Sequence, residues 1–168
     1  EEQPTFNRKT GREVAATYTT IYGLSLLLLY LQQYRADNRT VIGVELPLCD
    51  ELSDNVYLAG RVDLILADAS GYIVLDHKTT KYPDRYVMNP NHQFMTYTYL
   101  VSKLHGIQPS ELRMELDILG VSKSKTPTEI LARTPIAYSK DQIAGWADST
   151  IQNMATLKHC HITGKWPQ

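Results

Sequence analysis

The sequence predicts an α/β protein whose elements follow the order helix, three strands, helix, strand, strand, helix. Three observations support this prediction: an apolar stretch with the helical period, three successive segments rich in Val, Ile and Leu, and an alternating strand pattern between two later helical segments. The 168 residues have 43% hydrophobic and 21% charged content, which fits one globular domain with a packed core.

The first helix is predicted from about Arg12 to Tyr34, because this stretch lacks proline and repeats apolar residues at intervals of three and four. Its most apolar part, Ile21 to Leu31, is shorter than the roughly 20 residues of a membrane span, and it lacks the N-terminal position and basic flank of a signal peptide. We therefore expect a helix that is largely buried toward its end, and no membrane partner.

Three strands are predicted next, over Val41–Leu48, Val56–Asp68 and Gly71–Thr79, since these segments are rich in β-formers and end at turn residues. The sequence "DASG" between the last two suits a tight hairpin turn. We expect these two strands to pair antiparallel.

The second half of the chain predicts a helix from about Asn91 to Leu104, with Gly106 as its C-terminal stop. The segment "ELRMELDILGVSK" alternates apolar and polar residues as a half-buried strand does, and "EILARTPIAY" predicts another strand. A final amphipathic helix is predicted over residues 139–160, with Ser139 as its N-cap.

Composition narrows the class of protein. A formal net charge of −1 gives no general attraction to nucleic acid, so such a partner requires a local basic patch. The two cysteines, Cys49 and Cys160, form neither a disulfide framework nor a Cys-x-x-Cys zinc motif, which predicts a reducing, cytoplasmic setting. We expect residues 1–168 to be one domain. Because the chain lacks an initiator methionine, this domain is expected to stand either alone or as a fragment of a longer protein.

Two aspartates and a lysine interrupt the predicted hairpin. Asp63 and Asp76 lie at about the same distance on either side of the "DASG" turn, so pairing places them nearly opposite each other. Lys78 follows two residues after Asp76 and shares its face. A simple ion pair between Lys78 and one aspartate is the plainer interpretation. However, two carboxylates buried near a core are costly unless a divalent cation lies between them, which favours a metal site.

The ordered pattern Glu45, Gly60-Arg61-x-Asp63, Asp76-x-Lys78-Thr79 and Gln93-x-x-x-Tyr97 resembles the RecB-type branch of the PD-(D/E)XK nuclease superfamily over residues 12–121. The resemblance implies a restriction-endonuclease-like core with a central mixed β-sheet flanked by helices. It also implies that Asp63, Asp76 and the backbone carbonyl of His77 bind Mg²⁺ or Mn²⁺, and that Lys78 serves the nucleophilic water.

Glu45 is a further candidate metal ligand, and its alternative is an ordinary edge-strand carboxylate. The resemblance implies that Gln93 and Tyr97 face the active site or the DNA backbone, and their spacing places both on one helix face. An exposed glutamine and a core tyrosine are the alternatives. His92 lies about 100° further round that helix and is expected to face solvent.

Basic residues near the predicted strand ends are candidates for contacts to phosphates, which hold DNA without reading its sequence. They are Lys81, Arg85, Lys103, Lys123 and Lys125, and Tyr82 and Tyr86 are candidates for stacking on bases. A solvated basic rim is the alternative. No helix-turn-helix or zinc-finger pattern is present, so recognition of strand ends or of structure is expected.

The leading hypothesis is a metal-dependent DNA exonuclease of recombination, repair or phage origin, with a helicase or recombination protein as a further partner. A structure-selective endonuclease is the alternative enzyme. RecB-type domains often carry a histidine on the helix before the first strand, whereas no histidine precedes His77 here. A nucleic-acid-binding or assembly module with a degenerate site is the alternative that would explain this difference. A structural calcium site would leave Lys78 unexplained. An iron-sulfur cluster is not predicted, because the chain has only two cysteines and related clusters use four.

Overall fold

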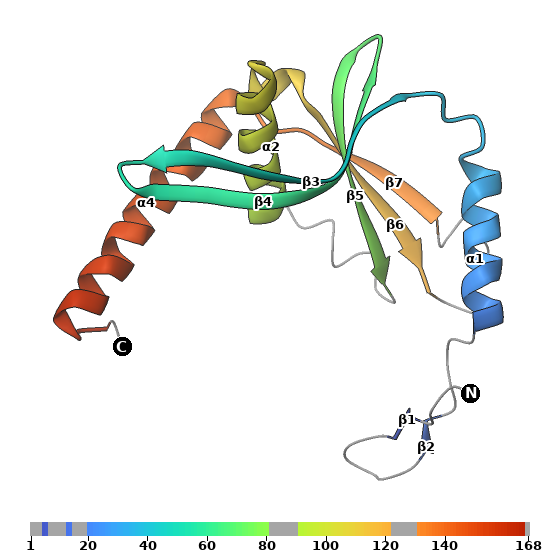
Figure 1. Ribbon diagram of the computed structural model, residues 1–168, viewed down its shortest axis with the longest axis horizontal. Coiled ribbons are helices and arrows are strands. Elements are labelled where there is room, and N and C mark those ends of the chain that lie inside the picture. The colour runs from blue at the N-terminus through green and yellow to red at the C-terminus, as the bar shows by residue number, and fades with distance from the viewer. Residues whose placement is uncertain (1–4, 7–12, 15–19, 81–90, 122–130, 167–168) are drawn as a thin grey trace. The chain divides into compact units, whose positions relative to one another are not determined.

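The computed structural model describes residues 5–6, 13–14, 20–80, 91–121 and 131–166 (Figure 1). The chain divides into two compact units, residues 1–37 and 38–168. Among the described residues, no helix is long and apolar enough to cross a membrane. The prediction of one domain stays a prediction.

The first unit differs from the predicted long helix. Thr5–Phe6 (β1) and Glu13–Val14 (β2) pair as a short antiparallel ladder, and the helix α1 extends over Thr20–Gln33. The predicted start at Arg12 is therefore wrong. The short ladder gives the physical reason, because Glu13 and Val14 pair in an extended conformation, which the β-branched valine favours.

The leucines of α1 are also less buried than their pattern predicts. Leu26 is buried, whereas four other leucines of the helix are at least half exposed, namely Leu24, Leu27, Leu28 and Leu31. Successive helical residues point about 100° apart, so a run of leucines extends round the helix and its members cannot all face one side. The expectation of a largely buried helix end is wrong for these four side chains.

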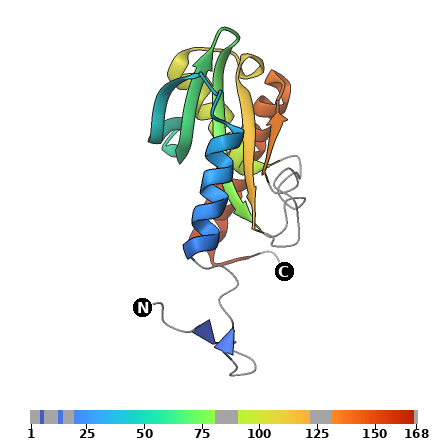
Figure 2. The same cartoon turned by 90° about the vertical axis from the view of Figure 1, so that its right-hand side faces the viewer.

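The second unit is built on a five-stranded sheet in the order β3-β4-β5-β6-β7 (Figures 1 and 2). The strands are β3 (Thr40–Ser53), β4 (Val56–Asp68), β5 (Gly71–Thr80), β6 (Arg113–Gly120) and β7 (Leu131–Ile136). Neighbouring strands pair antiparallel except β5 and β6, which are parallel. The predicted strands and the mixed sheet are confirmed, and Asp68 pairs with Gly71 at the predicted hairpin turn.

The helix α2 (His92–His105) and the short 3-10 helix η2 (Pro109–Glu111) lie between β5 and β6 in the chain, and α4 (Lys140–Thr163) follows β7. Apolar residues of α2 and of the first half of α4 pack against the sheet, and the core includes Val74, Phe94, Val101, Leu116 and Trp146. Strand alternation places Val74, Asp76 and Lys78 of β5 on this helix-covered face. Leu75 and His77 consequently lie on the opposite face.

The start of α4 and the end of α2 lie at the residues that the sequence predicts for them. The Ser139 hydroxyl accepts a hydrogen bond from the Gln142 N–H, and the Gln142 side chain accepts one from the Ser139 N–H, which completes a capping box. Gly106 ends α2 with φ of 64°, a left-handed conformation that favours glycine. Each of these interactions fixes where a helix begins or ends relative to the sheet.

Candidate active site

The β4–β5 hairpin brings Asp63 and Asp76 together at the point where the two strands separate. The ladder between them ends at the pair Leu64 and Leu75, and Asp63 and Asp76 are next in that register. Beyond it, the Asp63 side chain takes over the role of a ladder acceptor, since its Oδ2 accepts a hydrogen bond of 2.9 Å from the His77 N–H. The carboxylate of one strand thus holds the backbone of the other.

Asp76 is fully buried and contacts two polar side chains. The Lys78 Nζ lies 2.8 Å from its Oδ2, and the Gln93 Nε2 donates to its Oδ1 at 3.1 Å. Burial raises the pKa of Asp76 because it disfavours the charged form, and the nearby Asp63 carboxylate adds to the rise. Lys78 acts in the opposite direction and lowers the pKa. The site therefore holds a carboxylate whose negative charge needs a cation beside it.

A chain of hydrogen bonds runs from Asp76 through α2 to β4. The Gln93 Nε2 also lies 2.8 Å from the Tyr97 hydroxyl, and that hydroxyl donates to the Arg61 carbonyl at 2.8 Å. Gln93 and Tyr97 share one helix face, as their spacing predicts. Tyr97 is a buried core residue, as the alternative predicts, and its part in an active site stays a prediction.

Gly60 explains how Tyr97 reaches β4. A Cβ atom at this position would lie 3.2 Å from the Tyr97 ring carbon Cε1, which is a tighter contact than a side chain normally makes. Glycine therefore lets the ring lie against the strand and its hydroxyl reach the Arg61 carbonyl. Gly60 belongs to the pattern that carries the family resemblance, and this packing role was not predicted, although a glycine within a strand is a known sign of close approach.

The start of α2 is fixed by three side chains, which in turn places Gln93. The Asn91 Oδ1 accepts from the N–H groups of Gln93 and Phe94 at 2.9 and 3.4 Å, as an N-cap does. The Tyr138 hydroxyl accepts from the Asn91 N–H, and the Trp146 Nε1 donates to the His92 Nδ1 at 3.0 Å. His92 is exposed as expected, and its hydrogen bond to Trp146 ties α2 to α4.

Glu45 lies across from Asp63 in the β3–β4 register but turns toward another residue. Its Oε2 lies 2.9 Å from the Arg61 Nε, with both side chains more than half exposed, and its φ is 49°. Exposed ion pairs contribute about 0–1 kcal/mol, so this one is easily exchanged for another partner. A role for Glu45 as a metal ligand stays a prediction.

Four predicted DNA contacts, Lys81, Arg85, Lys123 and Lys125, lie outside the described residues, as do Tyr82 and Tyr86. Their attachment points are described. Thr80 ends β5 beside Gly120 at the end of β6, and the Val121 N–H donates to the Thr80 carbonyl at 2.8 Å. The described ends of β5 and β6 therefore lie side by side, two residues beyond Lys78.

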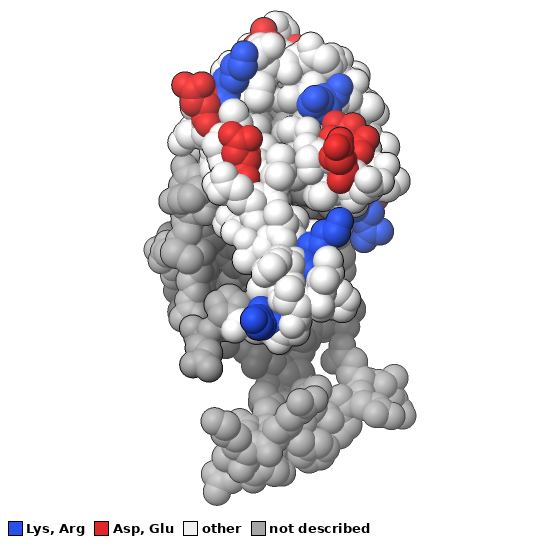
Figure 3. All heavy atoms as spheres, turned by 90° about the vertical axis from the view of Figure 1, so that its left-hand side faces the viewer, with Lys and Arg blue, Asp and Glu red and all other residues white. Residues whose placement is uncertain are grey.

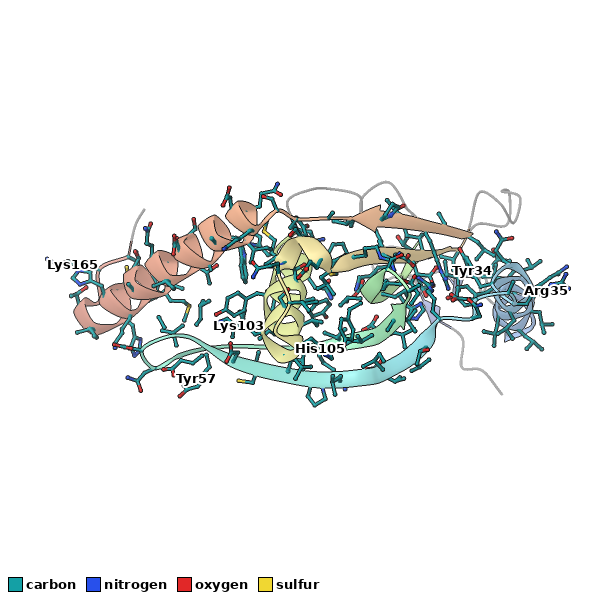
Figure 4. The ribbon with its side chains drawn as sticks, turned by 90° about the horizontal axis from the view of Figure 1, so that it is seen from above. Tyr34, Arg35, Tyr57, Lys103, His105 and Lys165 are labelled. Carbon is teal, nitrogen blue, oxygen red and sulfur yellow. The ribbon has the colours of Figure 1, made fainter. Side chains whose placement is uncertain are left out.

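Lys103 is the one predicted basic contact that lies among the described residues. It lies near the end of α2, ten residues after Gln93 and thus about 15 Å along the helix axis. Its ammonium group lies 5.6 Å from the centroid of the Tyr99 ring, and Figure 4 labels Lys103 and His105, which both belong to the last turn of α2. Lys103 is therefore well removed from the paired carboxylates.

The donor atoms fit a small divalent cation. Asp63 and Asp76 supply hard carboxylate oxygens, and the hydrogen bond that Asp63 accepts from the His77 N–H is made by its Oδ2. No group of three or more His, Cys, Asp or Glu side chains gathers as a metal site within the part of the chain that is described. Two carboxylates, a backbone carbonyl and water would suit Mg²⁺ or Mn²⁺, since such ions keep several waters.

A family model described as the PD-(D/E)XK nuclease superfamily matches residues 12–166. The chain belongs to this superfamily, whose members are nucleases that generally use divalent metal ions such as Mg²⁺. The restriction-endonuclease-like fold expected from the resemblance is thereby confirmed. The RecB-type subdivision stays a prediction.

No curated protein matches the chain. The solved structure titled "Crystal structure of SSO0001" is 18% identical with a TM-score of 0.42, over 79% of this chain and 58% of that one. The chain therefore spans less than two thirds of the length of that protein.

The raised pKa of Asp76 predicts how metal binding depends on pH. A ligand must be deprotonated to bind, so Mn²⁺ affinity should fall on acidification at a pH above the usual carboxyl value of 3.8. In metal-free protein, acidification has the opposite effect on the stability of the fold. The Asp76 contribution to the free energy of unfolding is fully present below its unfolded pKa and is lost as the pH rises through its folded pKa. Calorimetric Mn²⁺ titrations from about pH 4.5 to 7.5 measure the first effect.

The matched control is His77→Asn, which removes the nearby imidazole and keeps an N–H donor, so that the remaining pH dependence belongs to the carboxylates. An affinity that stays constant in this variant down to about pH 4.5 would contradict a raised pKa at a metal ligand.

Proposed function

We propose that this chain is a metal-dependent nuclease that hydrolyses DNA phosphodiester bonds, and that it acts as a RecB-type exonuclease. The observation that carries the proposal is the buried Asp76 carboxylate, which contacts Lys78 and Gln93 and lies beside Asp63. Structural ion pairs seldom combine a fully buried acid with a second acid next to it, because the second charge is unfavourable there.

Each residue has a defined part in this proposal. Asp63, Asp76 and the His77 carbonyl would hold the divalent ion, which polarises the phosphodiester and lowers the pKa of bound water. Gln93 and Tyr97 keep the Asp76 carboxylate oriented. Lys78 is the one ammonium group at Asp76 among the described residues, and it would orient or deprotonate the attacking water or stabilise the charge that develops on the phosphate.

The charge distribution favours a local basic patch, and not a general positive field, as the part of the protein that contacts the DNA backbone. On the face in Figure 3, basic and acidic side chains of the described residues are interspersed, and the net charge is −1. We propose that the segments beyond Thr80 and Val121, with Lys81, Arg85, Lys123 and Lys125, bind the phosphates. A role in recombination, repair or phage replication, a cytoplasmic setting and a helicase or recombination partner are proposed on the resemblance alone.

A test with end-labelled linear DNA and closed circular DNA decides between the alternatives. With Mg²⁺ or Mn²⁺, an exonuclease should release nucleotides from the linear substrate and leave closed circles intact. Cleavage of circles would favour the structure-selective endonuclease. The proposal fails if neither substrate is cut with either metal, and DNA binding without cleavage would then support the module with a degenerate site.

The ion pair of Lys78 with Asp76 predicts an effect of Lys78→Ala that depends on metal. In metal-free protein the variant should melt at a lower temperature, because Asp76 loses its cation. Saturating Mn²⁺ should remove most of this difference, since the ion supplies the missing charge. Turnover should still fall by about 100-fold or more, as when one preorganised catalytic group is lost.

Melting temperatures with and without Mn²⁺, and metal-dependent cleavage on the same preparations, measure both effects. Lys78→Arg keeps the charge and is the matched control for the metal-free melting temperature. A variant that is destabilised equally with and without Mn²⁺, and that cuts at the normal rate, would assign Lys78 to the fold and not to the chemical step.

A further inference from the structure

Three polar residues lie in register on the face of the sheet opposite Asp76. His77 of β5 pairs with Asp117 of β6, and Asp117 pairs with Arg133 of β7. The His77 Nδ1 lies 3.1 Å from the Asp117 Oδ2, and the Arg133 Nε lies 3.3 Å from the Asp117 Oδ1. A carboxylate accepts, so the His77 tautomer with its proton on Nδ1 donates to Asp117, whereas the Arg133 Nε meets the Asp117 Oδ1 as an ion pair without a hydrogen bond. We call these three residues the Asp117 row.

Stability alone does not explain the Asp117 row. The Asp117 side chain has no exposed surface, and bringing a carboxylate out of water costs several kcal/mol before its partners compensate. Apolar residues of similar size in such positions are often as stabilising as a buried ion pair. The row does supply something that apolar residues lack, a fixed direction for the His77 side chain, because a hydrogen bond is directional.

His77 lies between Asp76 and Lys78, and its backbone belongs to the candidate active site. Its N–H donates to Asp63, and its carbonyl is a predicted metal ligand. The ladder from β5 to β4 ends at Leu75, so beyond this point the pairing with β6 and the side chain of Asp63 hold β5. Because side chains alternate along a strand, fixing the imidazole on one face fixes the rotation of Asp76 and Lys78 on the other.

We propose that Asp117 is a positioning residue that acts through His77 on the metal-binding carboxylates Asp63 and Asp76. Arg133 holds Asp117, Asp117 holds the imidazole of His77, and the His77 backbone holds Asp63 at the distance from Asp76 that a metal ion needs. This inference rests on the proposed function, since it assumes a divalent ion at that pair. Residues that orient metal ligands in this way typically change metal affinity or activity by about 10–100-fold when they are mutated.

The test compares two substitutions of the half-exposed His77 in the full chain. His77→Leu keeps the bulk of the side chain and removes the hydrogen bond, whereas His77→Asn places an amide N–H near the position of the Nδ1–H. Mn²⁺ affinity, measured by calorimetry below the melting temperature of each variant, should fall by about 10-fold or more in His77→Leu and recover most of that loss in His77→Asn. The kcat for DNA cleavage should follow the affinity, and the KM for DNA should change little.

Asp117→Leu, which removes the acceptor for the His77 Nδ1–H, tests whether the effect passes through His77. Alone it should weaken Mn²⁺ binding, and in the His77→Leu background it should add no further loss, because residues that act in series are not additive. Glu115→Gln is the matched control: Glu115 lies two residues away on the same face of β6, and its Oε2 pairs with the Arg39 Nη1 at 2.7 Å. It should change stability and leave Mn²⁺ affinity as in the wild type.

Three outcomes would overturn the inference: wild-type Mn²⁺ affinity in His77→Leu, additive losses in the double variant, or an equal loss in Glu115→Gln. Failure of the proposed function is a separate result. It would appear in the wild-type protein itself, as a chain that binds no Mn²⁺ and cuts no DNA, whereas the positioning inference fails when the wild type binds and cuts and His77→Leu does the same.

Discussion

Burial of the Asp76 carboxylate beneath the first turn of α2 is the constraint on which the candidate site depends. A carboxylate with no exposed surface must contact groups that compensate its charge, and here these are the Lys78 ammonium and the Gln93 amide. Lys78 reaches it because a strand repeats its facing every two residues, and Gln93 reaches it because α2 begins just beyond Asn91. The N-cap of α2 and the alternation of side chains along β5 therefore bring two polar groups to the same carboxylate, that of Asp76.

The same strand is held differently on its two sides. Toward β4 its backbone ladder stops at Leu75, and the Asp63 side chain replaces the missing backbone acceptor for His77. Toward β6 the parallel ladder continues through Thr80. Beyond Leu75 the two carboxylates are therefore not joined by a backbone ladder, whereas the continued pairing with β6 holds the backbone of Asp76 in place. The end of β5 is therefore held by backbone hydrogen bonds on the β6 side and by the Asp63 side chain on the β4 side.

Much of the fold and of the central pair follows from local pattern. The "DASG" turn and the period of two set the hairpin that opposes Asp63 to Asp76, and both signals lie within one short stretch of the sequence. Other features depend on contacts distant in sequence. Gly60 has its role only because α2 brings a tyrosine against it, Glu45 turns toward a neighbouring cation through its own backbone conformation, and Asp117 becomes significant only when β6 lies beside β5. Strand pairing and side-chain direction at that range are not encoded in periodicity.

The central claim is that Asp63 and Asp76 together bind a divalent cation, and calorimetric titration of Mn²⁺ into Asp63→Asn tests it most directly. The asparagine Oδ1 can still accept from the His77 N–H, so the hairpin should remain folded while the negative charge at this position is lost. The account predicts that Asp63→Asn melts close to the wild type without metal and has lost most of its Mn²⁺ affinity. A variant that binds Mn²⁺ as tightly as the wild type would place the metal elsewhere and contradict the account.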